Sequence, residues 1–212
     1  LTFEHEENKK KYAYDKVIML AGGVGYANMR DALKGDPAPG EKVVLLGGDN
    51  YRIGMGGGAV SSVNTGQYTS GIELNAVQRA NPEMQKRVSN VIRAIAESDN
   101  NPVISIHDHG AGGHLNCLSE LVEATGGHID MSQLPVGDPT LSAKEIVGNE
   151  SQERMGIVIR EEDIEHIRQI ADRERAPFYV VGETTGDHRF VFEQTDGVKP
   201  IDLSLIHISE PT

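Results

Sequence analysis

The segment His107–Asn116, HDHGAGGHLN, concentrates the residues of this sequence that could do chemistry. Three histidines and an aspartate lie within eight positions, with glycine and alanine between them. Imidazole and carboxylate groups at short spacing are ligands for Zn²⁺. Glycines between a strand and a helix instead favour a turn at which a phosphate can approach the backbone. These two interpretations lead to different functions.

A metal site would use His107, Asp108, His109 and His114, and would indicate a metal-dependent hydrolase. Residues two apart on a strand share a face, so His107 and His109 would point together while Asp108 points away. His114 falls in the first turn of the following helix, beyond four small residues. No second cluster in the sequence completes a coordination shell. We therefore keep zinc as the minor alternative, and otherwise expect the histidines to be polar residues at the edge of an element.

The phosphate interpretation rests on Gly110, Ala111, Gly112 and Gly113, which join a predicted strand to a predicted helix. A helix N-terminus offers unpaired N–H groups and a partial positive charge. The carboxylate of Asp108, just before the turn, would repel an anion unless a cation lay between them. Asp108 is therefore predicted to bind Mg²⁺. A plain strand-to-helix turn, with glycine for geometry alone, stays equally open.

Two other segments could contribute to a site. The glycines of Gly54–Gly58 could cradle a phosphate or permit close packing, and the loop lacks the lysine of a P-loop. The polar block Asn149–Glu153 precedes a predicted strand. On its own, such a block is more often a solvated loop than a ligand site.

Composition limits the class of partner. The 212 residues suit one large domain, or one domain with part of another. The net charge of −12 argues against nucleic acid and against an anionic membrane as partners. A single cysteine, Cys117, allows no intrachain disulfide and fits a reducing compartment, so we expect a cytoplasmic protein. No apolar run approaches the roughly 20 residues that span a bilayer.

The hydrophobic pattern predicts strands alternating with helices, and hence a layered α/β domain with a mixed sheet. Residues 4–16 are charged and aperiodic, and we expect them to form an exposed linker or insertion. We expect strands over 17–23, 43–48, 102–106, 155–159, 178–183 and 189–193, and helices over 81–97, from about 113 to a stop at Gly126, and within 161–174. Cys117 falls within the second of these helices and reads as a core residue.

Six segments, taken in order, resemble the large, multidomain form of the phosphoribosylformylglycinamidine synthase family. They are IMLAGGVG, LGGDNYRIGMGGGAVSS, NAVQRANPEMQKR, NPVISIHDHGAGGHLN, VGNESQERM and RERAPFYVVGE. QRANPEM and NESQER are specific, whereas the glycine loops also fit the wider superfamily that includes aminoimidazole ribonucleotide synthetase. The resemblance covers about Val17 to Leu203. It implies the C-terminal half of the first synthetase unit. The implied fold is a three-layer α/β/α domain with a mixed sheet, resembling the C-terminal domain of aminoimidazole ribonucleotide synthetase.

The resemblance implies an ATP-dependent amidation in which formylglycinamide ribonucleotide and glutamine give formylglycinamidine ribonucleotide and glutamate. ATP would be the cosubstrate and Mg²⁺ the cofactor. Asp108 matches a Mg²⁺ ligand, and Gly110–Gly113 would lie close to the nucleotide. The residues that match substrate contacts are Gln78, Glu150, Ser151 and Gln152. His107 and His109 would be neighbours of the site, and His114 receives no role.

The resemblance also implies that the chain is a fragment, inactive alone, because an upstream ATP loop and a glutaminase domain are missing. Those two parts of the same polypeptide would be its partners. We expect a linker over 1–30, the α/β domain over 31–203 and a non-native tail over 204–212. A third function class stays open: a non-catalytic module that binds a nucleotide for stability alone.

Overall fold

The structure is a computed structural model that describes residues 4–13, 22–26, 28–31, 33–64, 66–77, 81–151 and 153–206. The chain forms two compact units, residues 1–32 and 33–212. The sheet, its covering helices and the candidate site all belong to the second unit.

The first unit contains an exposed hairpin where the sequence predicted a linker. Strand β1 (Glu4–Glu7) pairs antiparallel with β2 (Lys10–Ala13). The connecting residues Asn8 and Lys9 have φ angles of 54° and 61°, as in the tight turns that favour hairpins. Both strands are exposed, as the charged sequence indicated, but they were not predicted as strands, because a strand exposed on both faces carries no hydrophobic alternation. The strand predicted over 17–23 has residues 17–21 outside the described part, and residues 22 and 23 adopt no regular structure.

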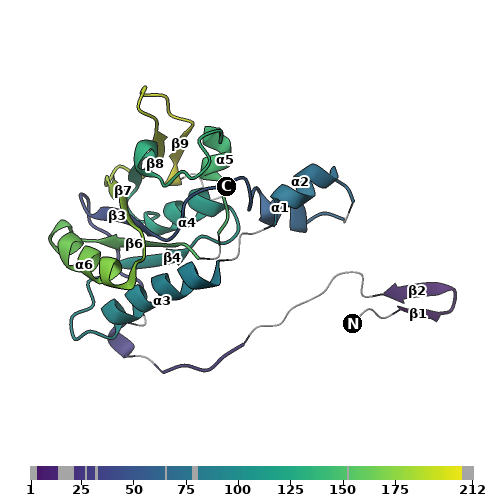
Figure 1. Ribbon diagram of the computed structural model, residues 1–212, viewed down its shortest axis with the longest axis horizontal. Helices are drawn as coiled ribbons and strands as arrows, with labels where there is room; N and C mark the ends of the chain where they lie inside the picture. Colours follow the sequence, from purple (N-terminus) through teal and green to yellow (C-terminus); the bar gives the residue numbers. More distant parts are fainter. Residues whose placement is uncertain are drawn as a thin grey trace. The chain divides into compact units, whose positions relative to one another are not determined.

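The second unit is built on a seven-stranded mixed sheet in the order β4-β6-β3-β7-β5-β8-β9 (Figure 1). Its strands are β3 (Lys42–Leu46), β4 (Ser105–Asp108), β5 (Gly127–Asp130), β6 (Met155–Ile159), β7 (Phe178–Thr184), β8 (Arg189–Glu193) and β9 (Ile201–Ser204). All neighbouring pairs are antiparallel except β5 and β8, which are parallel. The predicted mixed sheet is confirmed.

Helices cover both faces of the sheet. Val44 and Leu46 of β3 pack in a cluster with α3 (Pro82–Ala96) and α6 (Ile164–Glu174). Val43 and Leu45 pack in a second cluster with α4 (Gly113–Leu121) and α5 (Ala143–Val147). Figure 1 shows these two helix pairs on opposite sides of the strands. Because successive residues of a strand point to opposite faces, the apolar run of β3 builds both clusters and the predicted three layers.

The predicted helix over 81–97 is confirmed as α3. The Asn81 side chain caps it by accepting the backbone N–H of Met84 at 3.1 Å. Val88, Val91 and Ile95 form its buried stripe. Two shorter helices, α1 (Gly57–Ser61) and α2 (Ser70–Asn75), follow the first glycine loop and have no buried residue. Single 3-10 turns occupy 29–31, 131–133 and 161–163.

Three features of the sheet differ from expectation. Strand β4 begins at Ser105 rather than at residue 102. Strands β7 and β8, consecutive in sequence, are separated in the sheet by β5, which was not predicted. Strand β9 was also not predicted. Its last residue, Ser204, and the buried Leu205 that follows it belong to the predicted tail, whose residues 207–212 lie outside the described part.

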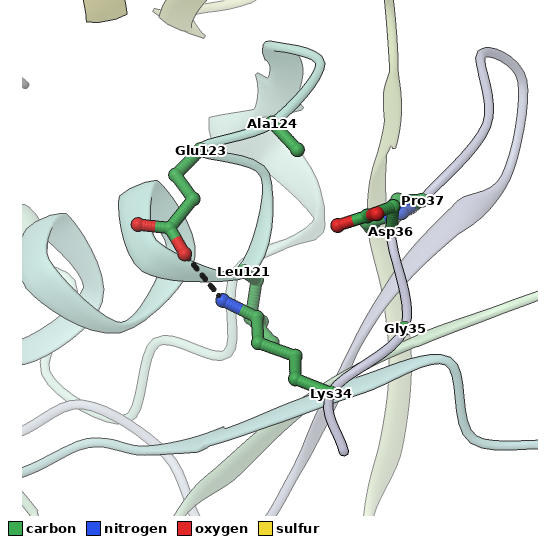
Figure 2. A pocket seen from close by; sticks show the side chains of 7 residues that line it. All are labelled: Lys34, Gly35, Asp36, Pro37, Leu121, Glu123 and Ala124. Atoms are coloured by element: carbon green, nitrogen blue, oxygen red, sulfur yellow. Dashed lines mark hydrogen bonds and ion pairs between the residues drawn. The ribbon is translucent and has the colours of Figure 1, made fainter.

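A small pocket of about 80 Å³ lies beside the end of α4 (Figure 2). The ammonium group of Lys34 donates to the carbonyl oxygen of Glu120 at 2.5 Å and to Glu123 Oε1 at 2.9 Å. A cation at this position satisfies a terminal carbonyl and complements the negative end of the helix dipole. The pocket is therefore explained by helix capping. Within the described residues, no helix has the length and apolar character to cross a membrane.

Candidate functional site

The polar block before β6 packs against both glycine-rich segments. The N–H of Glu150 donates to the carbonyl oxygen of Gly54 at 2.7 Å, and Met55 forms an isolated bridge with Asn149. The N–H of Ser151 donates to the carbonyl oxygen of His109 at 3.1 Å. Three segments that are distant in sequence therefore meet at one place, and the described residues of the block, Asn149, Glu150, Ser151 and Glu153, are buried rather than solvated.

The Glu150 carboxylate lies at the centre of this meeting point. Its side chain is directed into the protein, and the residue is 1% exposed. Oε1 accepts the N–H of Gly58 at 2.9 Å and the N–H of Gly112 at 3.0 Å. One carboxylate oxygen thus joins the first turn of α1 to the turn before α4.

The turn before α4 requires glycine because the polar block approaches it closely. Gly112 and Gly113 have φ angles of 82° and 57°, in the left-handed region. A Cβ on Gly113 would lie 2.4 Å from the carbonyl oxygen of Asn149. These glycines therefore allow the backbones to touch, which is one of the two roles that the sequence left open for them.

Several amides of the predicted phosphate turn already have acceptors within the chain. Gly110 donates to Asp108 Oδ1 at 2.7 Å, Gly112 to Glu150, and Gly113 to the carbonyl oxygen of Gly110 at 3.1 Å. In this conformation the turn binds carboxylate and carbonyl oxygens of its own chain. Contact between this turn and a nucleotide stays a prediction.

Asp108 ends strand β4 with an exposed carboxylate. Mg²⁺ is commonly held by one or two carboxylates, with waters and substrate phosphates completing its shell. A single exposed carboxylate beside a glycine turn fits such an open half-site. Among the described residues, no group of three or more His, Cys, Asp or Glu side chains could hold a metal by itself. Any ion at Asp108 would therefore depend on a ligand for further oxygens.

The histidines do not converge on a common point. His107 is half-buried, and its Nε2 lies 2.6 Å from Glu120 Oε2. His109 and His114 are fully buried, with His109 Nε2 lying 3.1 Å from His114 Nδ1. His109 directly follows β4 and His114 lies in the first turn of α4, so both stand at the edge of an element as expected, but their side chains are fully buried. The described residues give no support to a zinc hydrolase.

Burial lowers the pKa values of His109 and His114 well below the ordinary value, and the nearby positive charge of Arg154 lowers them further. Both imidazoles are therefore neutral near pH 7. Arg154 Nη1 lies 2.8 Å from His114 Nε2, which can accept this hydrogen bond only in its unprotonated form. Burial likewise raises the pKa of Cys117 far above its usual range, so the thiol is an inert core group, as predicted.

Acidification should destabilise the protein through these two histidines. Their folded-state pKa values lie below the ordinary value of 6.5, so the unfolded chain binds more protons at acidic pH. The free energy of unfolding should be highest above about pH 7 and should fall as the pH decreases through about 6.5. Each histidine contributes a slope of up to about 1.4 kcal/mol per pH unit. Urea unfolding between pH 5 and 7.5 measures this slope.

The variant His114→Gln should lose about half of that slope. His166→Gln is the matched control, because it removes an exposed imidazole of α6 instead of a buried one. Equal slopes in the wild type and in His114→Gln would show that the buried pair does not cause the effect.

Sequence reasoning assigned no separate role to Asn149, a member of the polar block, and did not single out Arg154. Asn149 Nδ2 donates to the carbonyl oxygens of Tyr51 and Ile53 at 2.7 and 2.9 Å. The fully buried Arg154 donates to Asn149 Oδ1 and Asn149 O. A lone arginine directly before the apolar strand β6 was the available signal, since a residue at that position is often drawn into the core.

The four predicted substrate contacts have different surroundings. Ser151 is buried, and its hydroxyl has no hydrogen-bond partner among the described residues. A buried hydroxyl without a partner is costly, which favours a ligand or water at this position. The Glu150 carboxylate is engaged by the chain itself. Gln78 and Gln152 lie outside the described residues.

Residues 38–194 match a family model described as AIR synthase related protein, C-terminal domain. A protein of Dictyostelium discoideum named phosphoribosylformylglycinamidine synthase is 39% identical over 202 residues. That alignment covers 93% of this chain but 15% of the relative, so the chain spans about a seventh of its length. The human protein of the same name is 45% identical over 178 residues, covering 83% of this chain and 13% of its own.

Among solved structures, Thermotoga maritima PurL complexed with FGAR superposes with a TM-score of 0.75. The match covers 84% of this chain and 29% of PurL, at 24% identity. At this identity the likeness shows the α/β fold alone, and it agrees with the seven-stranded sheet and its two helix layers.

Proposed function

The chain belongs to the family of AIR synthase related proteins through their C-terminal domain, and from this premise we propose that it is part of a phosphoribosylformylglycinamidine synthase. The reaction is the ATP-dependent amidation of formylglycinamide ribonucleotide, FGAR. Relatives of that name match most of this chain, and the structural neighbour PurL was solved with FGAR.

One observation carries the proposal beyond the family. The hydrogen bond from Ser151 N to His109 O brings the proposed substrate segment beside the residue that follows Asp108. A buried hydroxyl without a partner and an exposed carboxylate are thus anchored to one strand end. A hydroxyl and a carboxylate placed in this way could bind a phosphorylated substrate together with a metal ion.

The reaction depends on positioning the substrates and stabilising charge more than on covalent catalysis by the protein. ATP activates the formamide oxygen of FGAR as a phosphoryl ester, and ammonia from glutamine then displaces phosphate. Mg²⁺ held by Asp108 would supply charge stabilisation for the phosphates. Ser151, Gln78 and Gln152 would orient FGAR with neutral donors and acceptors, which add no charge beside the anionic substrate.

The remaining parts of the reaction belong outside this chain. An N-terminal synthetase half would complete the ATP site, and a glutaminase domain would release ammonia from glutamine. Both would be parts of the same cytoplasmic polypeptide. The 15% of the relative's length that this chain spans supports such an arrangement.

The test uses the full-length polypeptide that carries this segment. Ser151→Ala should raise the KM for FGAR by about tenfold, because a hydrogen bond to a charged ligand contributes roughly 1.5 kcal/mol. Asp108→Asn should raise the Mg²⁺ concentration needed for half-maximal rate. Ser119→Ala is the matched control, since that hydroxyl donates to the carbonyl oxygen of Asn116 within α4.

The same measurement separates the alternative of a non-catalytic nucleotide-binding module. In that case Ser151→Ala and Asp108→Asn would leave the amidation rate unchanged at every FGAR and Mg²⁺ concentration. That outcome would refute the proposal.

A further inference from the structure

The resemblance to the synthase family implies that Glu150 contacts substrate, but its carboxylate is directed away from solvent. Oε1 accepts two backbone N–H groups from different segments, Gly58 and Gly112. Oε2 occupies the space on the other side, where a Cβ on Gly57 would lie 2.6 Å from it. The charged group is therefore enclosed by the two glycine segments that the sequence left without an assigned ligand.

We propose that Glu150 is a positioning residue whose carboxylate clamps the Gly54–Gly58 loop to the Gly110–Gly113 turn, and that it does not act as a substrate ligand. The backbone N–H groups of the two glycine segments form a binding site for an anion, and the Glu150 carboxylate occupies it. The clamp deepens the proposed function, because it sets where Asp108 and Ser151 lie, but its existence does not depend on which substrate binds.

Hydrogen-bond chemistry explains why a glutamate is needed. A buried carboxylate is stable only where donors replace its lost water, and backbone N–H groups supply them without a second charge. Hydrogen bonds to an ionised acceptor are about twice as strong as those between neutral groups. One charged oxygen can thus hold two segments whose glycines offer no side chains for packing.

The two clamped segments are also in close contact with each other beside the carboxylate. A Cβ on Gly58 would lie 3.0 Å from the Cβ of Ala111. The backbone of Glu150 adds a further link, since its N–H donates to Gly54 O at 2.7 Å. The side chain and the backbone of one residue therefore fix both segments.

The clamp reaches the proposed ligand groups through short stretches of backbone. Gly112 is two residues from Gly110, whose N–H donates to Asp108 Oδ1. Ser151 directly follows Glu150 and donates to His109 O. Releasing the carboxylate should therefore shift Asp108 and Ser151 relative to one another, although Glu150 itself touches neither the metal nor the substrate.

The decisive experiment is amide hydrogen exchange by NMR in this chain without any ligand. Glu150→Ala should speed exchange of the Gly58 and Gly112 amides by about tenfold or more, because each loses a charged acceptor. Glu150→Gln keeps an acceptor oxygen and should speed exchange by less than about threefold. Glu162→Ala, at an exposed glutamate in the turn before α6, is the matched control and should change neither amide.

The wild-type chain provides a readout that needs no variant to fold. A scalar coupling across each hydrogen bond should link the Gly58 and Gly112 nitrogens to the Glu150 carboxylate carbon. Absence of both couplings, or unchanged exchange in Glu150→Ala, would overturn the clamp. Either result leaves the Ser151 and Asp108 kinetics untouched, so failure of the clamp and failure of the proposed function are distinguishable.

The activity of the full-length polypeptide distinguishes a positioning role of Glu150 from a role as a substrate ligand. A clamp predicts that Glu150→Gln retains most of the activity and that Glu150→Ala lowers kcat as well as raising the KM for FGAR. A ligand that acts through its charge predicts an equal rise in KM for both variants with kcat preserved, and that pattern would reject the positioning role.

Discussion

Replacing Arg154 with methionine should lower the free energy of unfolding by about 4 kcal/mol, because at least two hydrogen bonds from a charged donor are lost. The guanidinium group is fully buried and donates to Asn149 Oδ1 and toward His114 Nε2. Methionine fills much of the aliphatic volume but leaves these acceptors without their donor. Chemical denaturation at pH 7.5, where the histidines are neutral, measures the loss.

Arg154→Lys separates charge from geometry. Lysine keeps the positive charge but cannot reproduce the planar fork that reaches Asn149 and His114 together. We expect it to recover less than half of the lost stability. Arg160→Met, at an exposed arginine after β6, should change stability by less than about 0.5 kcal/mol. A similar loss in both methionine variants would mean that the buried network contributes nothing specific.

Replacing Gly54 with alanine should be equally severe, with a loss of about 4 kcal/mol or failure to fold. Gly54 has a φ angle of 78°, where a side chain adds roughly 1–2 kcal/mol of strain. A Cβ there would lie 2.1 Å from the carbonyl oxygen of Glu150, so the backbone must move and the hydrogen bond between the two residues is lost. Thermal unfolding measures the effect.

Gly71→Ala is the matched control for this substitution. Gly71 lies in α2, has no positive φ and would place its Cβ in open space. Alanine there should be neutral or should stabilise the helix by up to about 1 kcal/mol. If Gly54→Ala were tolerated as well as Gly71→Ala, the close contact between the glycine loop and the polar block would be disproved.

The elements that the sequence predicted correctly are those with a strong local signal. Helix α3 has a capping asparagine, proline at its first position and an apolar stripe, all of which act within a few residues. Strands β3 and β6, which pair with each other inside the sheet, are largely apolar runs. The layered α/β class followed from their alternation with helices.

Strand order could not be predicted in the same way, because pairing depends on distant partners. Strands β7 and β8 look like a hairpin in sequence, yet β5 pairs with both of them. β5 itself spans only Gly127–Asp130, too short for a periodic signal. The charged hairpin of the first unit has no apolar face and was missed for a related reason.

The candidate site was predicted in part. The sequence singled out the glycine turn and, through a resemblance, the polar block, but it could not show that they touch. His109 and His114 illustrate the limit: the sequence placed both at the ends of elements, but it could not show that the fold buries both beside Arg154. Burial of a polar residue is decided by partners elsewhere in the chain, here Asn50 and Arg154.

The contact between Glu150 and Gly58 joins residues 92 positions apart. Closing a flexible loop of that length costs an entropy that grows with the logarithm of its length, on the order of 4 kcal/mol before any constant term. Two hydrogen bonds barely offset such a cost, so the carboxylate can reach its amides only after β3 and β6 have already paired. During synthesis on the ribosome, the binding region would thus be among the last parts to mature, and no short peptide excised from the chain would reproduce it.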